Sequence, residues 1–289
     1  MVPNPREGGH EIPEPDDLVV VTWNAHLFKG RLDDLIDDLR SGRLTGGKPA
    51  RHFVLLLQEL YRRGPDVPPF APDTRSAFAI ADRGGSGRDV HQHVSTLGLS
   101  MLYVPSMRNG AGAFEDRGNA IVSTEPLQAP FAVELPLERQ RRVAVGASIA
   151  MRTAAGPAPL EVVSAHLEPL SSPALLWFFK SPRPRQVASL LRTLESRRQS
   201  GVQSAGTVVG GDFNTIQGGA DEDAYSIARA WSRSLLNEDP RRTHRMGRLD
   251  YVFFRLREGW TATTARVDET YGSDHHPVLG RLVSGAVSP

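Results

Sequence analysis

The chain has 289 residues, of which 39% are hydrophobic and 23% charged, with a formal net charge of +1, as in one large or two small globular domains. It has no cysteine, which excludes disulfides and thiolate metal sites. The first residues combine prolines and acids where a signal peptide needs an apolar core, and the longest apolar run, residues 174–179, is too short to cross a bilayer. We expect a monomeric, cytoplasmic protein without a transmembrane segment.

The N-terminal half of the chain shows alternating predicted strands and short helices. Residues 1–17 are expected to form a flexible leader, and a single domain is expected over residues 18–289. The stretch LVVVTWN predicts a buried strand over 18–24, and apolar residues at helical spacing predict a helix over 32–39. The pattern then predicts a strand over 52–60, a loop over 61–90, a short helix over 91–98, a strand over 100–106, a glycine-rich loop over 109–118 and a strand over 119–123.

The C-terminal half is dominated by strands. The pattern predicts strands over 141–150 and 160–168, a helix around 187–194, a strand over 207–214, a helix over 221–236, and strands over 248–254, 262–267 and 277–283. Strands thus outnumber helices, and several neighbours are joined too briefly for a helical crossover. This favours two packed, partly antiparallel sheets with helices outside, a layered α/β sandwich.

The stretch TVVGGDFNT, residues 207–215, ends a buried strand with two glycines, an acid, an aromatic residue and an amide. Because alternate residues of an extended chain point the same way, Asp212 and Asn214 should face one side and Phe213 the other. A polar turn is the ordinary explanation of such residues taken alone. Their significance therefore depends on the other strand ends.

Polar side chains also stand at the ends of the other predicted strands. They are Asn24, Glu59, His166, Asp250, Asp274 and His275. Each has an ordinary explanation alone, such as a helix cap for Asn24, and the neighbouring His26 and His276 are assigned no role. Together, carboxylate and amide oxygens suit Mg²⁺, and a histidine with a carboxylate supplies a proton donor or charge stabiliser. The set therefore predicts metal-assisted attack of water on phosphorus.

Seven segments occur in an order that resembles the endonuclease/exonuclease/phosphatase superfamily, which has the deoxyribonuclease I-like fold. They are TWN, LLLQE, RGNAIVS, VVSAHLE, GGDFNT, RLDYVF and GSDHHP. The resemblance extends from about residue 19 to about residue 283. It implies an α/β protein, a four-layer α/β sandwich of two packed mixed β-sheets flanked by helices, in agreement with the strand pattern. It also implies that residues 18–289 form a single catalytic domain that hydrolyses phosphate esters.

The resemblance further implies a metal site and its surroundings. Glu59 would be the main ligand of Mg²⁺, for which Mn²⁺ can substitute, with help from Asn24 and Asp274, partly through waters. Asn119 would support the site from behind or contact the substrate, and Arg117 would contact a phosphate.

The same resemblance implies roles for the remaining strand-end residues. Asp212 would orient and deprotonate the attacking water, and Asn214 would hold that water or a phosphate oxygen in line. His275 would stabilise the negative charge that develops on the phosphorane, and His166 would contact the phosphate from the other side. Asp250 would orient one of these two histidines, and the sequence leaves open which.

Two loops give opposite indications about the substrate, which the fold alone does not determine. A basic rim precedes Asp250 and suits a polyanion; its members are Arg241, Arg242, Arg245 and Arg248. An apolar loop follows His166 and is suited either to a lipid interface or to packing on the next helix. It contains Leu175, Leu176, Trp177, Phe178 and Phe179.

The leading hypothesis is a Mg²⁺-dependent phosphodiesterase, a nuclease acting on DNA or RNA. His166 disfavours the abasic-site endonucleases, which usually carry asparagine at that position. A sphingomyelinase-like or inositol-phosphate phosphohydrolase with the same site is the alternative. A pseudoenzyme that only binds nucleic acid is a third hypothesis, which the complete set of expected site residues disfavours.

Overall fold

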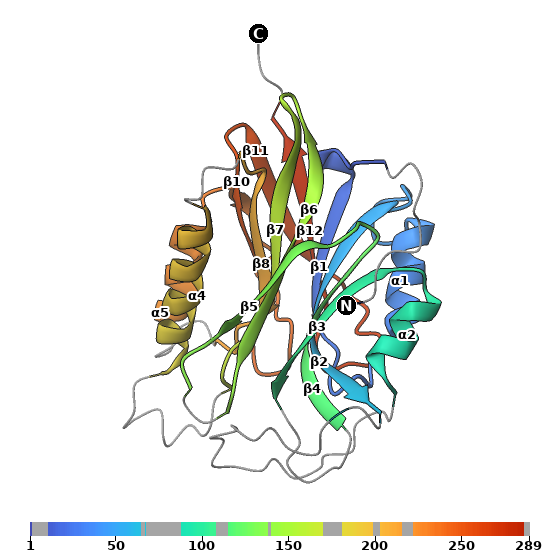
Figure 1. The fold of residues 1–289 in the computed structure, drawn as a ribbon, viewed down its shortest axis with the longest axis vertical. Coiled ribbons are helices and arrows are strands. Elements are labelled where there is room, and N and C mark those ends of the chain that lie inside the picture. Colours follow the sequence, from blue (N-terminus) through green and yellow to red (C-terminus); the bar gives the residue numbers. More distant parts are fainter. Residues whose placement is uncertain are drawn as a thin grey trace.

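A seven-stranded mixed sheet forms one half of the molecule (Figure 1). The computed structural model describes residues 1, 11–64, 67, 88–107, 115–137, 140–169, 181–198, 203–215 and 222–285. In spatial order, the sheet contains β3 (Ser100–Met107), β4 (Glu115–Ser123), β2 (His52–Arg63), β1 (Leu18–Asn24), β12 (Val278–Ser284), β11 (Trp260–Arg266) and β9 (Leu235–Asn237). The central pair, β1 and β2, is parallel, whereas β12 runs antiparallel to β1.

A five-stranded mixed sheet packs face to face against the first one. Its strands, in spatial order, are β10 (Asp250–Leu256), β8 (Gly206–Asp212), β7 (Gly156–His166), β6 (Val143–Thr153) and β5 (Gln128–Glu134). The strands β7 and β8 are parallel, and β10 runs antiparallel to β8. Both predicted sheets are therefore present and both are mixed.

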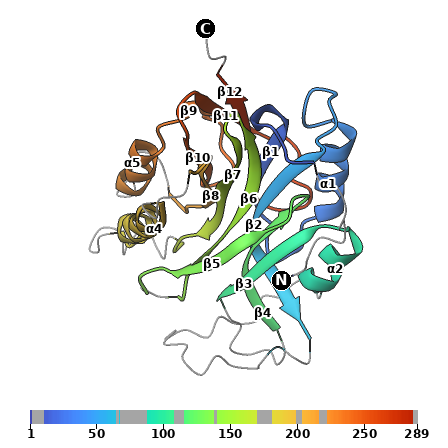
Figure 2. The same ribbon diagram turned by 45° about the horizontal axis from the view of Figure 1, so that its top comes forward.

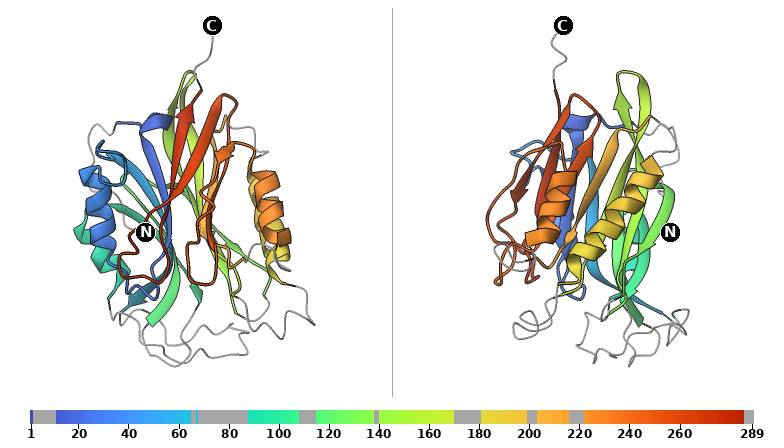
Figure 3. Two further views of the ribbon diagram at one scale, coloured as in Figure 1. Left: turned by 180° about the vertical axis from the view of Figure 1, so that it is seen from behind. Right: turned by 90° about the vertical axis from the view of Figure 1, so that its left-hand side faces the viewer.

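Helices cover the outer face of each sheet (Figures 2 and 3). The first sheet carries α1 (Leu32–Ser41) and α2 (Val90–Thr96), and the second carries α4 (Arg183–Arg198) and α5 (Glu222–Trp231). A short 3₁₀ turn, η1 (Pro15–Asp17), precedes β1. The predicted four-layer α/β sandwich is confirmed. Among the residues that the structure describes, no helix is long and apolar enough to cross a membrane.

The central strands are buried on both faces, which explains their continuous apolar sequences. In β1, Val19, Val21 and Trp23 pack beneath the helices, while Leu18 and Val20 face the other sheet. The helix α1 contributes its apolar stripe, including Leu35 and Ile36, to the same layer as Trp23. Burial of these alternating faces fixes which way each strand-end side chain points, because a shift of one residue would turn every side chain over.

Two glycines at the end of β8 allow its close packing. A Cβ atom on Gly211 would lie 1.8 Å from the carbonyl oxygen of Ala165 on β7. A Cβ atom on Gly210 would lie 2.7 Å from Leu56 of the opposite sheet. Both positions exclude a side chain, so β8 and its terminal Asp212 can approach β7 and the facing sheet.

The element boundaries differ from the sequence prediction in a few places. The strand β5 was not predicted, because it is an exposed edge strand that contains Pro130. The strand β4 begins at Glu115, within the expected glycine-rich loop, and α5 ends at Trp231. Residues 11–17 were expected to belong to the leader, yet Lys48 pairs with Asp17, and the backbone nitrogen of Arg152 donates to the carbonyl of Pro13.

Candidate active site

Most of the strand-end residues come together at one end of the two sheets. The strands β1, β7 and β8 run toward the lower end in Figure 1, away from the C-terminus. Strand register accounts for this meeting. His166 at the end of β7 is paired with Asp212 at the end of β8, and Asp212 is paired with Asp250 at the start of β10. Asn24 ends β1 in the facing sheet, and its Nδ2 donates to Asp212 Oδ2 at 3.0 Å. The two sheets therefore contribute to one site.

A carboxylate–histidine–carboxylate arrangement forms the centre of this site. Nδ1 of His275 lies 2.8 Å from Oδ2 of Asp250, so Asp250 orients His275 rather than His166. The opposite nitrogen, Nε2 of His275, lies 3.9 Å from Oδ2 of Asp212. Trp23 Nε1 donates to the carbonyl of His275 at 3.1 Å, which anchors the loop that carries it. The imidazole is thereby fixed between two acids.

The two central groups have strongly shifted acidities. Burial raises the pKa of Asp212 from 3.8 to about 7, although the His275 imidazolium and the hydrogen bond from Asn24 act in the opposite direction. Burial alone would lower the pKa of His275, but Asp250, Asp212 and Asp274 together raise it to about 10. Near neutral pH the site thus holds a carboxyl group able to take a proton and an imidazolium able to stabilise negative charge.

His166 lies on the other side of Asp212, with its Nε2 atom 3.5 Å from Oδ2. Burial, assisted by Arg142 and His275, holds the pKa of His166 well below its usual value of 6.5, so its ring is neutral. Within the described part of the chain, Nδ1 of His166 has no hydrogen-bond partner. A buried ring nitrogen left in this way is available to a ligand.

Arg142 is a buried cation that sequence reasoning did not select. Arg142 directly precedes β6 and is 2% exposed. Burial lowers the pKa of its guanidinium, although the nearby Glu168, Glu59 and Asp212 act in the opposite direction. Nη2 donates to Gln140, but Nε and Nη1 lack hydrogen-bond partners among the described residues. The signal in the sequence was a pair of arginines directly before an apolar strand. Nε lies 3.9 Å from Oε2 of the buried Glu168, so Arg142 is an ion-paired cation beside the site whose guanidinium suits a phosphate oxygen.

Glu59 reaches the site from an irregularity in β2. Gln58 and Glu59 together face the single residue Asn119 of β4, so the strand contains a β-bulge, and Glu59 has a left-handed φ of 55°. Gln58 points between the sheets, where its amide donates to Ser164 at 3.0 Å. The bulge therefore allows Gln58 to point between the sheets and Glu59 to point toward the turn after β1, while Leu60 stays buried.

The turn after β1 connects Glu59 with Asn24. His26, Leu27 and Phe28 all have left-handed φ angles, between 46° and 56°, which is a strained arrangement for residues other than glycine. In this turn, the backbone nitrogen of Leu27 donates to Oε2 of Glu59 at 3.1 Å, and that of His26 donates to Oδ1 of Asn24 at 3.0 Å.

The same turn links Asn24 with Asp274. His26 Nδ1 lies 3.3 Å from Oδ1 of Asp274, and Ser273 donates to the carbonyl of Asn24 at 2.7 Å. His26, which the sequence left without a role, therefore belongs to the site. Glu59, Asn24 and Asp274 carry oxygen atoms of the hard kind that bind divalent cations such as Mg²⁺, and Asp274 is accessible to solvent. These residues fit a divalent cation by their chemistry.

Phe213 packs on Tyr251 and Phe253 beneath the helices, away from Asp212, as predicted, whereas Asn214 lies beyond the end of β8 and does not continue the extended strand. The backbone nitrogen of Asn214 donates to Oδ1 of Asp212 at 2.9 Å, and φ is 51°. Its side-chain amide donates to the carbonyl of Leu167 at 3.0 Å. The carboxamide is thus held through its nitrogen, and its oxygen accepts no hydrogen bond from the residues that the structure describes.

Two predicted contact residues, Arg117 and Asn119, lie inside the protein. Asn119 is fully buried, and its amide donates to the carbonyl of Val143 at 2.7 Å, which ties β4 to β6 beside Arg142. Arg117 is 4% exposed, and its Nε donates to the hydroxyl of Tyr61 at 2.7 Å. Asn119 therefore has the geometry of a support rather than of a substrate contact.

The members of the basic rim differ in their surroundings. The guanidinium of Arg241 pairs with Asp239 and, at 2.7 Å, with Asp268, but its side chain is 46% exposed, so its contact with phosphate stays a prediction. Arg248 is buried, and its Nη1 lies 3.0 Å from Oε2 of Glu238. Arg242 and Arg245 are exposed and retain the predicted orientation toward solvent. The predicted lipid loop, residues 175–179, lies outside the described residues.

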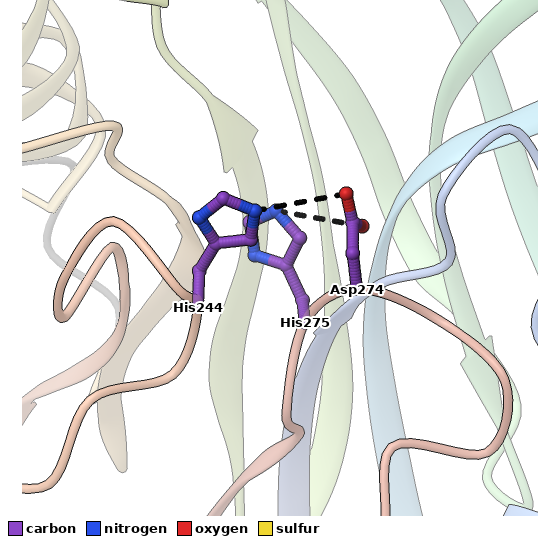
Figure 4. Close-up of side chains that lie close together, drawn as sticks. All are labelled: His244, Asp274 and His275. Atoms are coloured by element: carbon purple, nitrogen blue, oxygen red, sulfur yellow. Dashed lines mark ion pairs between the residues drawn. The ribbon is translucent and has the colours of Figure 1, made fainter.

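His244 is the third site residue that sequence reasoning missed. Its ring stacks on His275, with centroids 4.6 Å apart, and its Nε2 lies 3.6 Å from Oδ2 of Asp274 (Figure 4). The sequence contained a weak signal, because this histidine stands between Arg242 and Arg245. The position of His244 shortly before Asp250 in the sequence did not show that its ring would lie against His275, because that contact depends on the tertiary fold.

Comparisons with known proteins agree with this fold. The model of the Endonuclease/Exonuclease/phosphatase family matches residues 21–275. No curated protein matches the chain significantly. Similar solved structures include an endonuclease/exonuclease/phosphatase from Beutenbergia cavernae, with 19% identity, a TM-score of 0.60 and coverage of 93% of this chain and 72% of that one.

Two further structures share the fold. A family protein from Leptotrichia buccalis has 15% identity and a TM-score of 0.56, and the match covers 92% of this chain and 99% of the Leptotrichia chain. The catalytic domain of human Nocturnin, with a bound sulfate anion, has 16% identity and a TM-score of 0.53, with coverage of 94% and 96%. Identities this low establish the fold alone. The family match, which extends over most of the chain, shows that this protein belongs to the endonuclease/exonuclease/phosphatase family.

Proposed function

We propose that this protein is a Mg²⁺-dependent phosphodiesterase that cleaves nucleic acid by in-line attack of water. The observation that carries the proposal is the position of Asp212 between Asn24, His166 and His275, with His275 held by Asp250. An acid with a pKa near 7 takes a proton from water most effectively near neutral pH.

The chemistry assigns a task to each group around Asp212. Asp212 accepts the proton of the attacking water, whose oxygen forms a bond to phosphorus while the bond from phosphorus to the leaving ester oxygen breaks. The His275 imidazolium stabilises the charge on the non-bridging oxygens, and Arg142 supplies two further donors. A divalent cation held by Glu59, Asn24 and Asp274 would neutralise phosphate charge in the same region.

Nucleic acid is the substrate class that the exposed charges support. Arg242 and Arg245 flank His244 at the rim of the site and are open to solvent. The charge of Arg245 reaches His244, whose pKa is lowered by burial, by His275 and, less strongly, by this arginine. Two exposed guanidinium groups at the rim of the site suit a backbone with several phosphates rather than a single phosphate ester.

The experiment compares polymeric and small substrates. Cleavage of single- and double-stranded DNA and of RNA is measured beside hydrolysis of bis-p-nitrophenyl phosphate, with Mg²⁺ and with EDTA. Replacing both Arg242 and Arg245 by alanine should weaken cleavage of every polymer and flatten its salt dependence, but leave the small diester unaffected. The matched control is Arg51→Ala, an exposed arginine that precedes β2 at the opposite end of the sheet.

Two outcomes would contradict the proposal. Hydrolysis of the small diester without cleavage of any nucleic acid would refute nucleic acid as the substrate, but it would support phosphodiester hydrolysis as the reaction. Hydrolysis that continues at full rate in EDTA would remove the requirement for a divalent cation.

A further inference from the structure

His244 has no role in the proposed chemistry, yet the structure holds it firmly beside His275. Its backbone forms bridges to Gly247 and to His275, and its amide nitrogen donates to the carbonyl of Gly247 at 2.9 Å. The adjacent Thr243 accepts hydrogen bonds from the backbone nitrogens of Leu249 and Asp250. The loop before β10 is therefore ordered by the strand that carries Asp250, and the imidazole has a defined position.

The two imidazoles present their Nε2 atoms to the same region. The rings are stacked at an interplanar angle of 28°, and Figure 4 shows both Nε2 atoms directed toward Asp274. The two Nε2 atoms and a carboxylate oxygen of Asp274 lie within 4.8 Å of one another. The Asp274 oxygens are 3.6 Å from His244 and 4.0 Å from His275, too far for hydrogen bonds. Both nitrogens therefore remain available to a ligand.

The hydrogen bonding of His244 determines what its Nε2 atom offers. The backbone nitrogen of Met246 donates to Nδ1 of His244 at 3.1 Å. Because Nδ1 accepts a hydrogen bond, it carries no proton, so the neutral ring must carry its proton on Nε2. His244 thus presents an N–H donor to the site, in an orientation that its own backbone turn enforces.

The same argument decides against a metal centre at these three residues. A tetrahedral metal with bonds of about 2.0–2.2 Å needs ligand atoms a little over 3 Å apart, and small side-chain rotations would achieve this. However, a metal on Nε2 of His244 would require the proton on Nδ1, where it would face the Met246 N–H group. Two donors would then oppose each other in a buried place, which is costly.

We propose that His244 is a second substrate-contacting histidine, whose Nε2–H group binds a non-bridging oxygen of the scissile phosphate together with Nε2 of His275. The proposal rests on the proposed function, because it requires a phosphate ester in the site. Two nitrogens less than 4.8 Å apart can contact one phosphate group at two of its oxygens. A phosphate that enters here displaces the carboxylate of Asp274 from the vicinity of the rings.

The test uses two substitutions that separate the donor from the ring. His244→Phe keeps an aromatic ring for stacking on His275 but removes both nitrogens, whereas His244→Gln keeps an N–H donor near the position of Nε2. Loss of one hydrogen bond to a charged group should lower kcat/KM for bis-p-nitrophenyl phosphate about 10- to 100-fold in the phenylalanine variant. The glutamine variant should recover most of this loss. The control is His276→Gln, since Nδ1 of His276 bonds to the carbonyl of Val267.

A binding measurement keeps the proposal testable when a variant does not fold. In the wild-type protein with Mg²⁺, inorganic phosphate should shift the Nε2 resonance of His244 in ¹⁵N NMR spectra and leave His276 unchanged. The inhibition constant of inorganic phosphate should rise about tenfold in His244→Phe and far less in His244→Gln.

Three results would overturn the proposal while leaving the proposed function intact. They are full activity of His244→Phe, an equal loss in both variants, and inhibition of the wild type by Zn²⁺ that disappears in His244→Phe. The last result would show that His244 is a metal ligand. Inactivity of the wild type toward all phosphate esters would instead refute the proposed function itself.

Discussion

Replacing Asp212 by asparagine should abolish hydrolysis and at the same time stabilise the metal-free protein. The carboxyl group is 2% exposed, and burial raises its pKa from 3.8 to about 7. Such a shift corresponds to about 4 kcal/mol of destabilisation once the group is ionised in the folded state. The penalty is absent below about pH 4, grows between the two pKa values and is complete above about pH 7.

Asparagine carries no charge, so the penalty disappears, but one hydrogen bond disappears with it. The amide of Asn24 now donates to Asp212 Oδ2, and its orientation is fixed by the bond from His26 to Asn24 Oδ1. An asparagine at position 212 that still accepts from Asn214 would direct its own N–H groups toward Asn24, which costs about 1–2 kcal/mol. A net stabilisation of about 2 kcal/mol remains at pH 8, and almost none remains at pH 5.

Thermal unfolding in EDTA checks this prediction. For a chain of this size, about 2 kcal/mol raises Tm by roughly 5 °C, so the variant should exceed the wild type by that amount at pH 8 and match it at pH 5. Asp239→Asn is the control with opposite sign, because its hydrogen bonds with Arg241 hold the pKa of Asp239 below its usual value. That variant should lose stability above pH 4. A lower Tm for Asp212→Asn at pH 8 would refute the reasoning.

Three further predictions concern the metal and the histidines. Glu59→Gln should raise the Mg²⁺ concentration needed for half-maximal rate at least about tenfold, with Tm nearly unchanged; an unaltered Mg²⁺ titration would contradict its role as a ligand. In ¹⁵N NMR of the metal-free protein, His275 should be protonated at pH 8 and His166 neutral at pH 5.5, and Asp250→Asn should lower the pKa of His275. His275→Ala should reduce the hydrolysis rate about 10³-fold, whereas His276→Ala should have little effect; a large loss in His276→Ala with little loss in His275→Ala would show that the two rings have exchanged roles.

The two effects expected of Asp212→Asn, the loss of hydrolysis and the gain in stability, share one physical cause. Removing an ionisable group from water raises the free energy of its charged form, so a buried acid is both a better proton acceptor near neutral pH and a burden on stability. Asp212 has both properties because Gly210 and Gly211 let the end of β8 lie close to its neighbours. A side chain at either glycine would move the strand end and lower the burial of Asp212.

Much of the fold was predictable from local sequence. Continuous apolar runs such as residues 18–24 identify strands that are buried on both faces, and apolar residues at helical spacing identify α1. The strand β5 was missed because burial, the signal on which such predictions depend, is absent from an exposed edge strand. The early start of β4 was missed because its pairing with β2 and β3 is a long-range contact.

The sequence by itself determined many of the chemical groups in the site, because buried apolar runs locate the strands and polar residues stand where those runs end. It did not identify Arg142, His26 or His244. The opposite placement of Asp212 and Phe213 followed from alternation along the end of β8. Only the tertiary structure decided the partners: that Asp250 holds His275, that Arg241 is occupied by two acids, and that His244 stacks on His275. These contacts join residues far apart along the chain, and they depend on strand order, on the bulge at Glu59 and on left-handed turns that no local pattern specifies.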